Sequence, residues 1–160
     1  MFKIISILTA VLLLFTSSVE AQKTNTANKK RFSISAKSWV VADVNGKIIK
    51  GANTNDLRSI ASITKLMTAM VVLDANQNLD EKINDISRRQ HLRLALIRSN
   101  NDSSDLLCEH YPGGYQACVD AMNAKARSLK MRDTSFVDAS GLDDDNVSTS
   151  SSLIKLVLAA

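Results

Sequence analysis

Residues 59–70 of the 160-residue chain, SIASITKLMTAM, begin the most informative stretch of the sequence. A helix is predicted from near Ser62 to about Ala75, and its apolar residues cover a broad face. Those residues are Ile63, Leu66, Met67, Met70, Val71 and Leu73. A helix with so much apolar surface is expected to be buried, which bears on the polar residues at its start.

Ser62 and Lys65 form a Ser-x-x-Lys motif at the start of this helix. A spacing of three places both side chains on one helix face, within reach of each other. A serine hydroxyl is a weak nucleophile until a base takes its proton. Burial lowers the pKa of a lysine, so Lys65 can serve as that base near neutral pH. The helix N-terminus also favours the negative charge of an alkoxide or a tetrahedral oxyanion.

A second polar motif, Ser99-Asn100-Asn101, lies between two predicted helices. The Ser99 hydroxyl can relay a proton, and the Asn101 amide can hold a peptide-like substrate. A Ser/Asn-rich junction is ordinarily a helix cap, and many inert helices contain Ser-x-x-Lys. Each motif alone is therefore a weak indication, and only their combination points to a nucleophilic site.

The remaining pattern predicts an α+β chain. Residues 39–44 and 47–50 are β-rich and flank Asn45-Gly46, the strongest two-residue hairpin turn. Beyond Leu79 the pattern is mostly helical, with a short extended piece at 134–137 and a loop at 140–145. The predicted helices are His91–Ile97, Asp102–Tyr111, Tyr115–Leu129 and Leu153–Leu158. A hairpin, a buried helix and a block of helices, in that order, are typical of the α+β class.

The first residues predict export. Lys3 supplies a positive charge, and Ile4–Phe15 is a mostly apolar run too short for a comfortable membrane span. Val19-Glu20-Ala21 then offers small residues to a signal peptidase. We expect residues 1–21 to be a cleaved signal peptide, 22–32 a polar linker and 33–160 one domain in the periplasm. An uncleaved membrane anchor is the alternative.

Composition and charge narrow the class of partner. Apolar residues make up 45% of the chain and charged residues 22%, which is typical of a globular protein. The net charge of +4 comes from scattered Lys and Arg, whereas nucleic-acid binders cluster them, so no nucleic-acid partner is expected. The basic balance is compatible with anionic wall polymers or peripheral contact with a membrane.

Cys108 and Cys118 flank a turn at 111–114. In an oxidising compartment they can meet as a disulfide between adjacent helices, or both can be small buried apolar residues. Neither belongs to a nucleophilic motif. His91 and His110 are expected to be solvated helix residues, and no cluster of ligand residues indicates a metal or cofactor.

The two polar motifs and their surroundings closely resemble the low-molecular-mass penicillin-binding proteins, serine D-alanyl-D-alanine endopeptidases and carboxypeptidases. The resemblance runs from about Trp39 to Leu156. It includes the active-site helix at 59–70 and the second motif at 94–102. Further matching segments follow in the same order at 111–115, 121–126, 140–142 and 146–149. The resemblance implies part of a β-lactamase/transpeptidase-like fold, with an N-terminal hairpin, a buried nucleophile helix and a helical subdomain.

The resemblance also implies a role for each site residue. Ser62 would be acylated by a D-Ala-D-Ala peptide carbonyl or a β-lactam, with Lys65 as general base. Ser99 would pass a proton toward the leaving amine, and Asn101 would bind the substrate amide. The Ser62 backbone N–H would form one arm of the oxyanion hole. The implied partners are peptidoglycan stem peptides and crosslinks, with β-lactams as covalent inhibitors and no cofactor.

The sequence departs from the family in two places. No Lys is followed by Thr-Gly or Ser-Gly, so the third motif and the later sheet strands are absent from these 160 residues. Ser99 also follows Ser62 by only 37 positions, and residues 78–89 are expected to lack a hairpin-like piece. We therefore expect a C-terminally truncated domain with little peptidase activity and low stability, whose nucleophile helix is too little covered.

Two alternatives stay open. A β-lactamase shares both motifs, although no general-base glutamate stands out and the flanking residues favour a peptidase. A degenerate peptidoglycan-binding protein without catalysis would explain the missing third motif. The intact residues Ser62, Lys65, Ser99 and Asn101 weigh against it.

Overall fold

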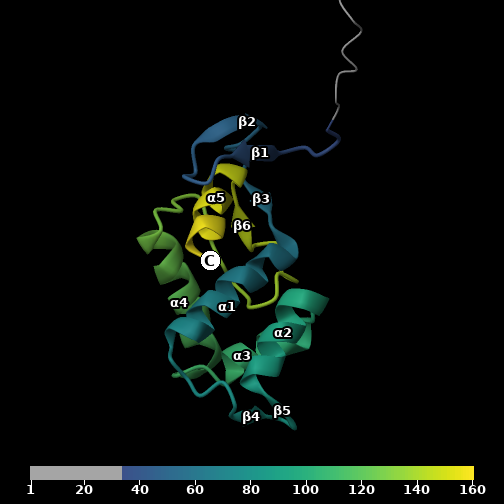
Figure 1. The fold of residues 1–160 in the computed structure, drawn as a ribbon, viewed down its shortest axis with the longest axis vertical. Coiled ribbons are helices and arrows are strands. Elements are labelled where there is room, and N and C mark those ends of the chain that lie inside the picture. The colour runs from purple at the N-terminus through teal and green to yellow at the C-terminus, as the bar shows by residue number, and fades with distance from the viewer. Residues whose placement is uncertain (1–33) are drawn as a thin grey trace, which may run out of the picture. The chain divides into compact units, whose positions relative to one another are not determined.

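The computed structural model describes residues 34–160, within which Ser35–Ala160 form one compact unit. The signal peptide and the linker predicted above lie outside the described residues. The strands are β1 (Trp39–Ala42), β2 (Ile48–Ala52), β3 (Arg58–Ser59), β4 (Lys82–Ile83), β5 (Ile86–Ser87) and β6 (Val147–Ser148). The helices are α1 (Thr64–Asp74), α2 (Arg88–Arg98), α3 (Asn101–Glu109), α4 (Gly114–Ser128) and α5 (Ser150–Ala159), with a 3₁₀ turn at Ala61–Ile63. Figure 1 shows the β1–β2 hairpin and the β4–β5 hairpin at opposite ends of this unit.

The predicted first hairpin is confirmed, but its turn is longer than two residues. β1 pairs antiparallel with β2, with Trp39 opposite Ala52. Residues 43–47 connect the strands, because the Asp43 carboxylate accepts hydrogen bonds from the backbone N–H groups of Asn45 and Lys47, both at 2.9 Å. An aspartate that caps its own turn in this way stabilises a wider loop than Asn-Gly alone.

Helix α1 is largely buried among the other helices, as predicted. Met67 and Val72 are fully buried, and α1 packs against α2, α3 and α4. The prediction that too little would cover this helix is wrong, because these three helices and Leu156 of α5 enclose it. Ile63 and Leu73 are exceptions on the predicted apolar face, with exposed fractions of 46% and 49%.

The helical block follows the predicted order with shifted boundaries. Thr149 caps α5, and its hydroxyl accepts a hydrogen bond from the Ser152 backbone N–H at 3.1 Å. Residues 78–87 are not helical, and the hairpin-like piece expected to be missing from 78–89 is present in minimal form as β4 and β5. Two-residue strands carry no readable periodicity, which explains the error.

Strands β3 and β6 form a second short pairing that brings distant segments together beside the start of α1 (Figure 1). Arg58 lies opposite Ser148, and the Ile60 backbone N–H donates to the Asn146 carbonyl at 3.0 Å. The loop at 140–145 therefore begins and ends close to the predicted nucleophile. This pairing was not predicted from the sequence.

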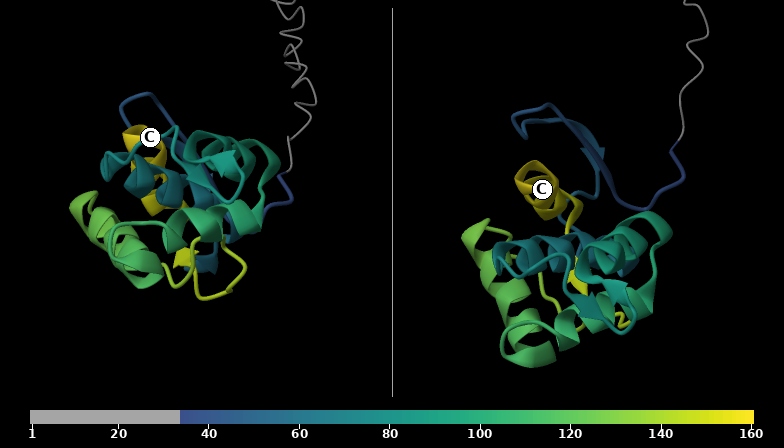
Figure 2. Two further views of the ribbon diagram at one scale, coloured as in Figure 1. Left: turned by 90° about the horizontal axis from the view of Figure 1, so that it is seen from below. Right: turned by 60° about the horizontal axis from the view of Figure 1, so that its bottom comes forward.

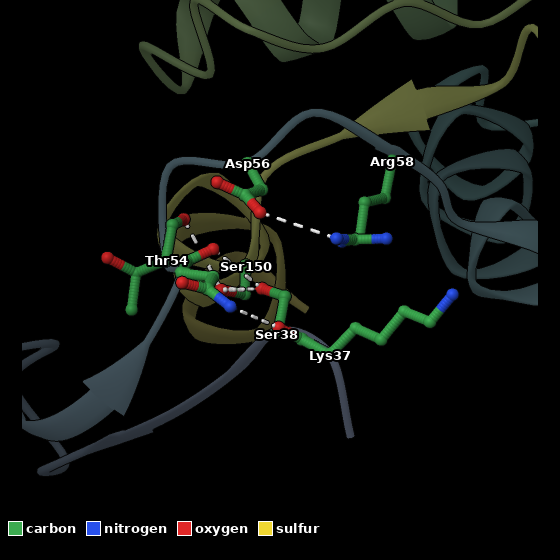
Figure 3. Close-up of polar contacts among 7 residues, drawn as sticks. Lys37, Ser38, Thr54, Asp56, Arg58 and Ser150 are labelled. Atoms are coloured by element: carbon green, nitrogen blue, oxygen red, sulfur yellow. Dashed lines mark hydrogen bonds and ion pairs between the residues drawn. The ribbon is translucent and has the colours of Figure 1, made fainter. Parts of the chain in front are cut away.

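Polar contacts attach α5 to the entry of the β1–β2 hairpin. The Ser38 and Ser150 hydroxyls lie 2.9 Å apart, and the Ser150 hydroxyl donates to the Thr54 carbonyl at 3.3 Å (Figure 3). Figure 2 shows α5 between this hairpin and the other helices. The contacts explain how a two-stranded sheet is held against the helical layer. None of the helices within residues 34–160 combines the length and the hydropathy needed to span a bilayer.

Candidate active site

Ser62 and Lys65 meet at the start of α1. Ser62 is exposed within the 3₁₀ turn, and the Lys65 Nζ lies 2.9 Å from its Oγ. The Lys65 side chain is only 2% exposed, so its amine reaches the hydroxyl from inside the protein. An exposed hydroxyl in contact with a buried amine is the arrangement required of a nucleophile and its base.

The loop that follows Phe136 supplies the second contact of Lys65. Its Nζ donates to the Ser140 carbonyl oxygen at 2.5 Å, and the Thr68 hydroxyl of the next helical turn donates to the Ala139 carbonyl at 2.7 Å. These bonds fix the loop against the buried face of α1. The Lys65 amine is thereby held between a backbone carbonyl and the Ser62 hydroxyl.

Burial and two nearby carboxylates have opposite effects on the pKa of Lys65. Burial lowers its pKa below the usual lysine value of 10.5, and the carboxylates of Asp105 and Asp138 act in the opposite direction. Burial raises the pKa of Asp105, which accepts a hydrogen bond from the Tyr115 hydroxyl at 3.2 Å. Burial also raises the pKa of Tyr115, to about 12. The net effect favours the neutral amine that a general base requires.

Hydrogen bonds favour the ionised form of Asp138. Burial raises its pKa, but backbone N–H groups of Asp143, Gly141 and Ser140 together with the Asn146 amide outweigh that effect and lower the pKa below 3.8. A carboxylate that accepts several N–H bonds is stabilised in its charged form. Asp105, Asp138 and Tyr115 were not predicted, and their sequence context carries no motif that identifies them.

The backbone around Ser62 is unusual. Ala61, directly before it, has a positive φ of 45°, which a non-glycine residue rarely adopts. Gly141 has a φ of 80°, and a Cβ at this position would collide with the Ala61 carbonyl group. The glycine of the Ser140-Gly141-Leu142 segment is therefore required both by its conformation and by close contact with the nucleophile turn.

The second motif lies at the junction of α2 and α3. Ser99 ends α2 in the left-handed conformation with φ 54° and is exposed, whereas Asn101 begins α3. Within residues 34–160, neither side chain makes a hydrogen bond, and no contact joins Ser99 to Lys65. Asn101 shares a face of α3 with Asp105, one turn later, whose carboxylate influences Lys65. The structure thus brings Ser62 and Lys65 together, but shows no direct contact of the second motif with them.

The cysteines and histidines have structural environments. A disulfide joins Cys108 of α3 to Cys118 of α4. The prediction of a solvated His91 is wrong, because its side chain is 4% exposed and its Nε2 lies 2.9 Å from the Ile83 carbonyl oxygen. Its Nδ1 lies 3.2 Å from the Ser103 hydroxyl, so hydrogen bonds on both ring nitrogens compensate its burial. His110 is exposed, as predicted.

Comparison with known proteins decides the family. The sequence profile of the D-alanyl-D-alanine carboxypeptidases matches residues 22–87 and 79–160, which is most of the chain. The chain belongs to the D-alanyl-D-alanine carboxypeptidase family. The two matched segments overlap at residues 79–87, the position of the minimal β4–β5 hairpin.

Individual relatives and solved structures agree with this family. The chain is 44% identical to a D-alanyl-D-alanine endopeptidase of Escherichia coli over 79% of its own length and 48% of that protein. It is 42% identical to the D-alanyl-D-alanine endopeptidase of Pseudomonas aeruginosa over 77% of this chain and 46% of that protein. Penicillin-binding protein D2 of Listeria monocytogenes, in a cefotaxime-bound crystal structure, is 31% identical with a TM-score of 0.71, covering 80% of this chain and 62% of that one. The chain spans about half the length of the curated relatives it matches. The fold is therefore part of the penicillin-binding-protein fold, as predicted.

Proposed function

We propose that this chain carries the nucleophile end of a serine D-Ala-D-Ala peptidase that acts on peptidoglycan peptides through an acyl-enzyme. The observation that carries the proposal is the 2.9 Å contact between the Lys65 Nζ and the Ser62 Oγ. The buried amine, whose pKa is lowered by burial, accepts the Ser62 proton. The Ser62 oxygen then attacks the peptide carbonyl, and the Ser62 backbone N–H stabilises the oxyanion that forms.

The remaining steps use the second motif. Collapse of the tetrahedral intermediate breaks the peptide bond and requires a proton on the leaving amine, which Ser99 passes on. Asn101 binds the amide of the substrate. Water hydrolyses the resulting ester and regenerates the Ser62 hydroxyl. The role of Asn101 is supported by its position on the same face of α3 as Asp105, whose carboxylate influences Lys65.

β-Lactams are proposed as covalent inhibitors of the same site. Two crystal structures of Listeria monocytogenes penicillin-binding protein D2 are of its cefotaxime-bound and ampicillin-bound forms. A β-lactam carbonyl presents the same electrophile to Ser62 as the peptide does. Substrates in the cell wall agree with export to the periplasm by the signal peptide proposed for residues 1–21.

The test is acylation of the purified chain by a fluorescent penicillin, followed by mass spectrometry of the modified peptide. We expect slow labelling confined to Ser62 and absent from Ser62→Ala, because the 160 residues contain no Lys-Thr-Gly motif. Labelling elsewhere, or labelling that survives in Ser62→Ala, contradicts the proposal. A long-lived adduct supports a peptidase, whereas rapid release of hydrolysed penicillin identifies a β-lactamase. Capture of muropeptides without any adduct identifies a non-catalytic binding protein.

A further inference from the structure

The Ser140 carbonyl controls the direction in which the Lys65 amine can accept a proton. A neutral amine has two N–H bonds and one lone pair, and Lys65 donates one N–H to this carbonyl at 2.5 Å. That bond restrains rotation of the amine and leaves the lone pair free to face the Ser62 hydroxyl, 2.9 Å away. The Ser140 carbonyl, by pointing at Lys65, thus favours the orientation in which the amine faces the Ser62 hydroxyl.

The Asp138 carboxylate fixes the orientation of this carbonyl. Its Oδ1 accepts hydrogen bonds from the backbone N–H groups of Ser140 at 3.0 Å and Gly141 at 2.6 Å. The Gly141 N–H and the Ser140 carbonyl belong to one planar trans peptide unit, in which the two groups point in opposite directions. Holding the N–H toward Asp138 therefore turns the carbonyl toward Lys65.

Asn146 locks the Asp138 side chain in place. It is fully buried, and its amide N–H donates to the Asp138 Oδ1 at 2.5 Å, while its own Oδ1 accepts from the Val137 backbone N–H at 2.6 Å. The Asn146 backbone carbonyl accepts from the N–H of Ile60, just before the nucleophile turn. Asn146 thus contacts both the Asp138 carboxylate and the backbone just before the turn that contains Ser62.

We propose that Asp138 is a positioning residue for Ser62 and Lys65. The Asp138 carboxylate holds the Gly141 N–H, and the Ser140 carbonyl of the same peptide unit then orients the Lys65 amine toward Ser62. The proposal rests on the proposed function of Ser62 and Lys65. Within residues 34–160 the Asp138 side chain makes no hydrogen bond to Ser62 or Lys65, so its positioning effect passes through the Gly141 peptide, separately from the effect of its charge on Lys65.

A positioning role and a charge role predict opposite effects of Asp138→Asn. The charged or titratable groups that influence Lys65 are Asp105 from α3 and Asp138 from the loop, with Tyr115 of α4 bonded to Asp105. Loss of the Asp138 charge lowers the pKa of Lys65 and makes more neutral base available at a given pH. An asparagine amide facing the Asp143 N–H, however, cannot accept the bond that this N–H makes with the carboxylate at 2.7 Å.

The first experiment measures the rate of Ser62 acylation by penicillin across pH in the unmodified chain, Asp138→Asn, Asp138→Glu and Asp145→Asn. Asp145 is the matched control, since it is exposed, lies in the same loop and makes no side-chain hydrogen bond within residues 34–160. In Asp138→Asn we expect the acylation rate at its high-pH plateau to fall about tenfold or more. The midpoint of the pH–rate profile is expected to move to lower pH. Asp138→Glu recovers part of the plateau and Asp145→Asn leaves it unchanged. A plateau that is unchanged or raised in Asp138→Asn overturns the proposal.

The second experiment does not depend on catalysis. Nuclear Overhauser contacts between the Lys65 ε-protons and Ser140 are expected in the unmodified chain and in Asp145→Asn, and are expected to be lost in Asp138→Asn while urea denaturation shows each variant folded. Persistence of these contacts in folded Asp138→Asn overturns the proposal. If the unmodified chain is not acylated at Ser62, the proposed function fails, and these contacts alone decide whether Asp138 positions the amine.

Discussion

At the scale of single residues, the position of Ser62 depends on backbone contacts as much as on its helix. Ala61 takes a positive φ of 45°, and Gly141 lies so close that any side chain there would strike the Ala61 carbonyl group. Strain of this kind persists only where surrounding structure enforces it, and it collects at active sites. The nucleophile turn and the Ser140 loop therefore form one unit.

Gly141→Ala tests this contact. We expect a loss of about 3 kcal/mol or more in the free energy of unfolding, because the change adds both a clash and an unfavourable φ. Gly114→Ala is the matched control, since Gly114 has a φ of 81° but no atom within 4 Å of the added Cβ. Its loss should be about 1 kcal/mol. Equal losses of the two variants in urea denaturation would show that the contact with Ala61 contributes nothing.

Sequence predicted the contact between Ser62 and Lys65 better than the residues that surround this pair. Ser62 and Lys65 were recognisable because a fixed spacing on a helix brings side chains together whatever the rest of the fold does. Asp105, Asp138 and Tyr115 come from three separate segments, and only the tertiary structure places them around Lys65. His91 was predicted incorrectly for the same reason, because its partners Ile83 and Ser103 come from neighbouring elements.

At the scale of elements, α3 and α4 are joined twice. The disulfide between Cys108 and Cys118 connects the end of α3 to the first turns of α4. The Tyr115 hydroxyl donates to Asp105 and accepts from the Ala139 backbone N–H at 3.1 Å, which links both helices to the loop that contacts Lys65. The geometry of α3, where Asn101 lies, is therefore coupled to that of the loop.

Removal of the disulfide by Cys108→Ala with Cys118→Ala should lower the free energy of unfolding by about 3 kcal/mol, because it frees the unfolded chain from a short closed loop. Urea denaturation of the oxidised chain, the reduced chain and the double variant measures this. Reduction of the unmodified chain should cause a similar loss. A reduced chain as stable as the oxidised one would contradict the expected contribution.

Long elements with a clear period were predicted, and short ones were not. The hairpin and the helices follow from alternation, turn chemistry and apolar spacing. The β3–β6 and β4–β5 pairs were missed, since strands of two residues are defined by their partners and not by their own sequence. β3 and β6 nevertheless hold the Ser140 loop against the nucleophile turn.

At the scale of the whole molecule, carboxylates near Lys65 affect stability with opposite signs. The pKa of Asp138 is lowered on folding, so its ionised form stabilises the protein above pH 3.8, and this contribution is lost as pH falls through the folded-state pKa. The pKa of Asp105 is raised, so its ionised form costs stability above the folded-state pKa, and the cost disappears below pH 3.8.

Asp138→Asn and Asp105→Asn should therefore change stability in opposite directions at pH 7. We expect Asp138→Asn to lose about 2 kcal/mol, because charge-assisted hydrogen bonds are lost. Asp105→Asn should gain stability while keeping an acceptor for the Tyr115 hydroxyl. Urea denaturation between pH 7 and pH 3 checks both, and both differences should shrink as the pH falls. Changes of the same sign at pH 7 would contradict the assigned charges.

Proton transfer from Ser62 requires a Lys65 amine that loses its proton more easily than an ordinary lysine. The most direct measurement is the titration of the Lys65 ε-carbon by nuclear magnetic resonance in the unmodified, unacylated chain, assigned by comparison with Lys65→Arg. We expect a midpoint below 10.5, because burial of the amine outweighs the attraction of Asp105 and Asp138. A midpoint at or above 10.5 would mean that Lys65 stays charged at neutral pH and cannot take the Ser62 proton.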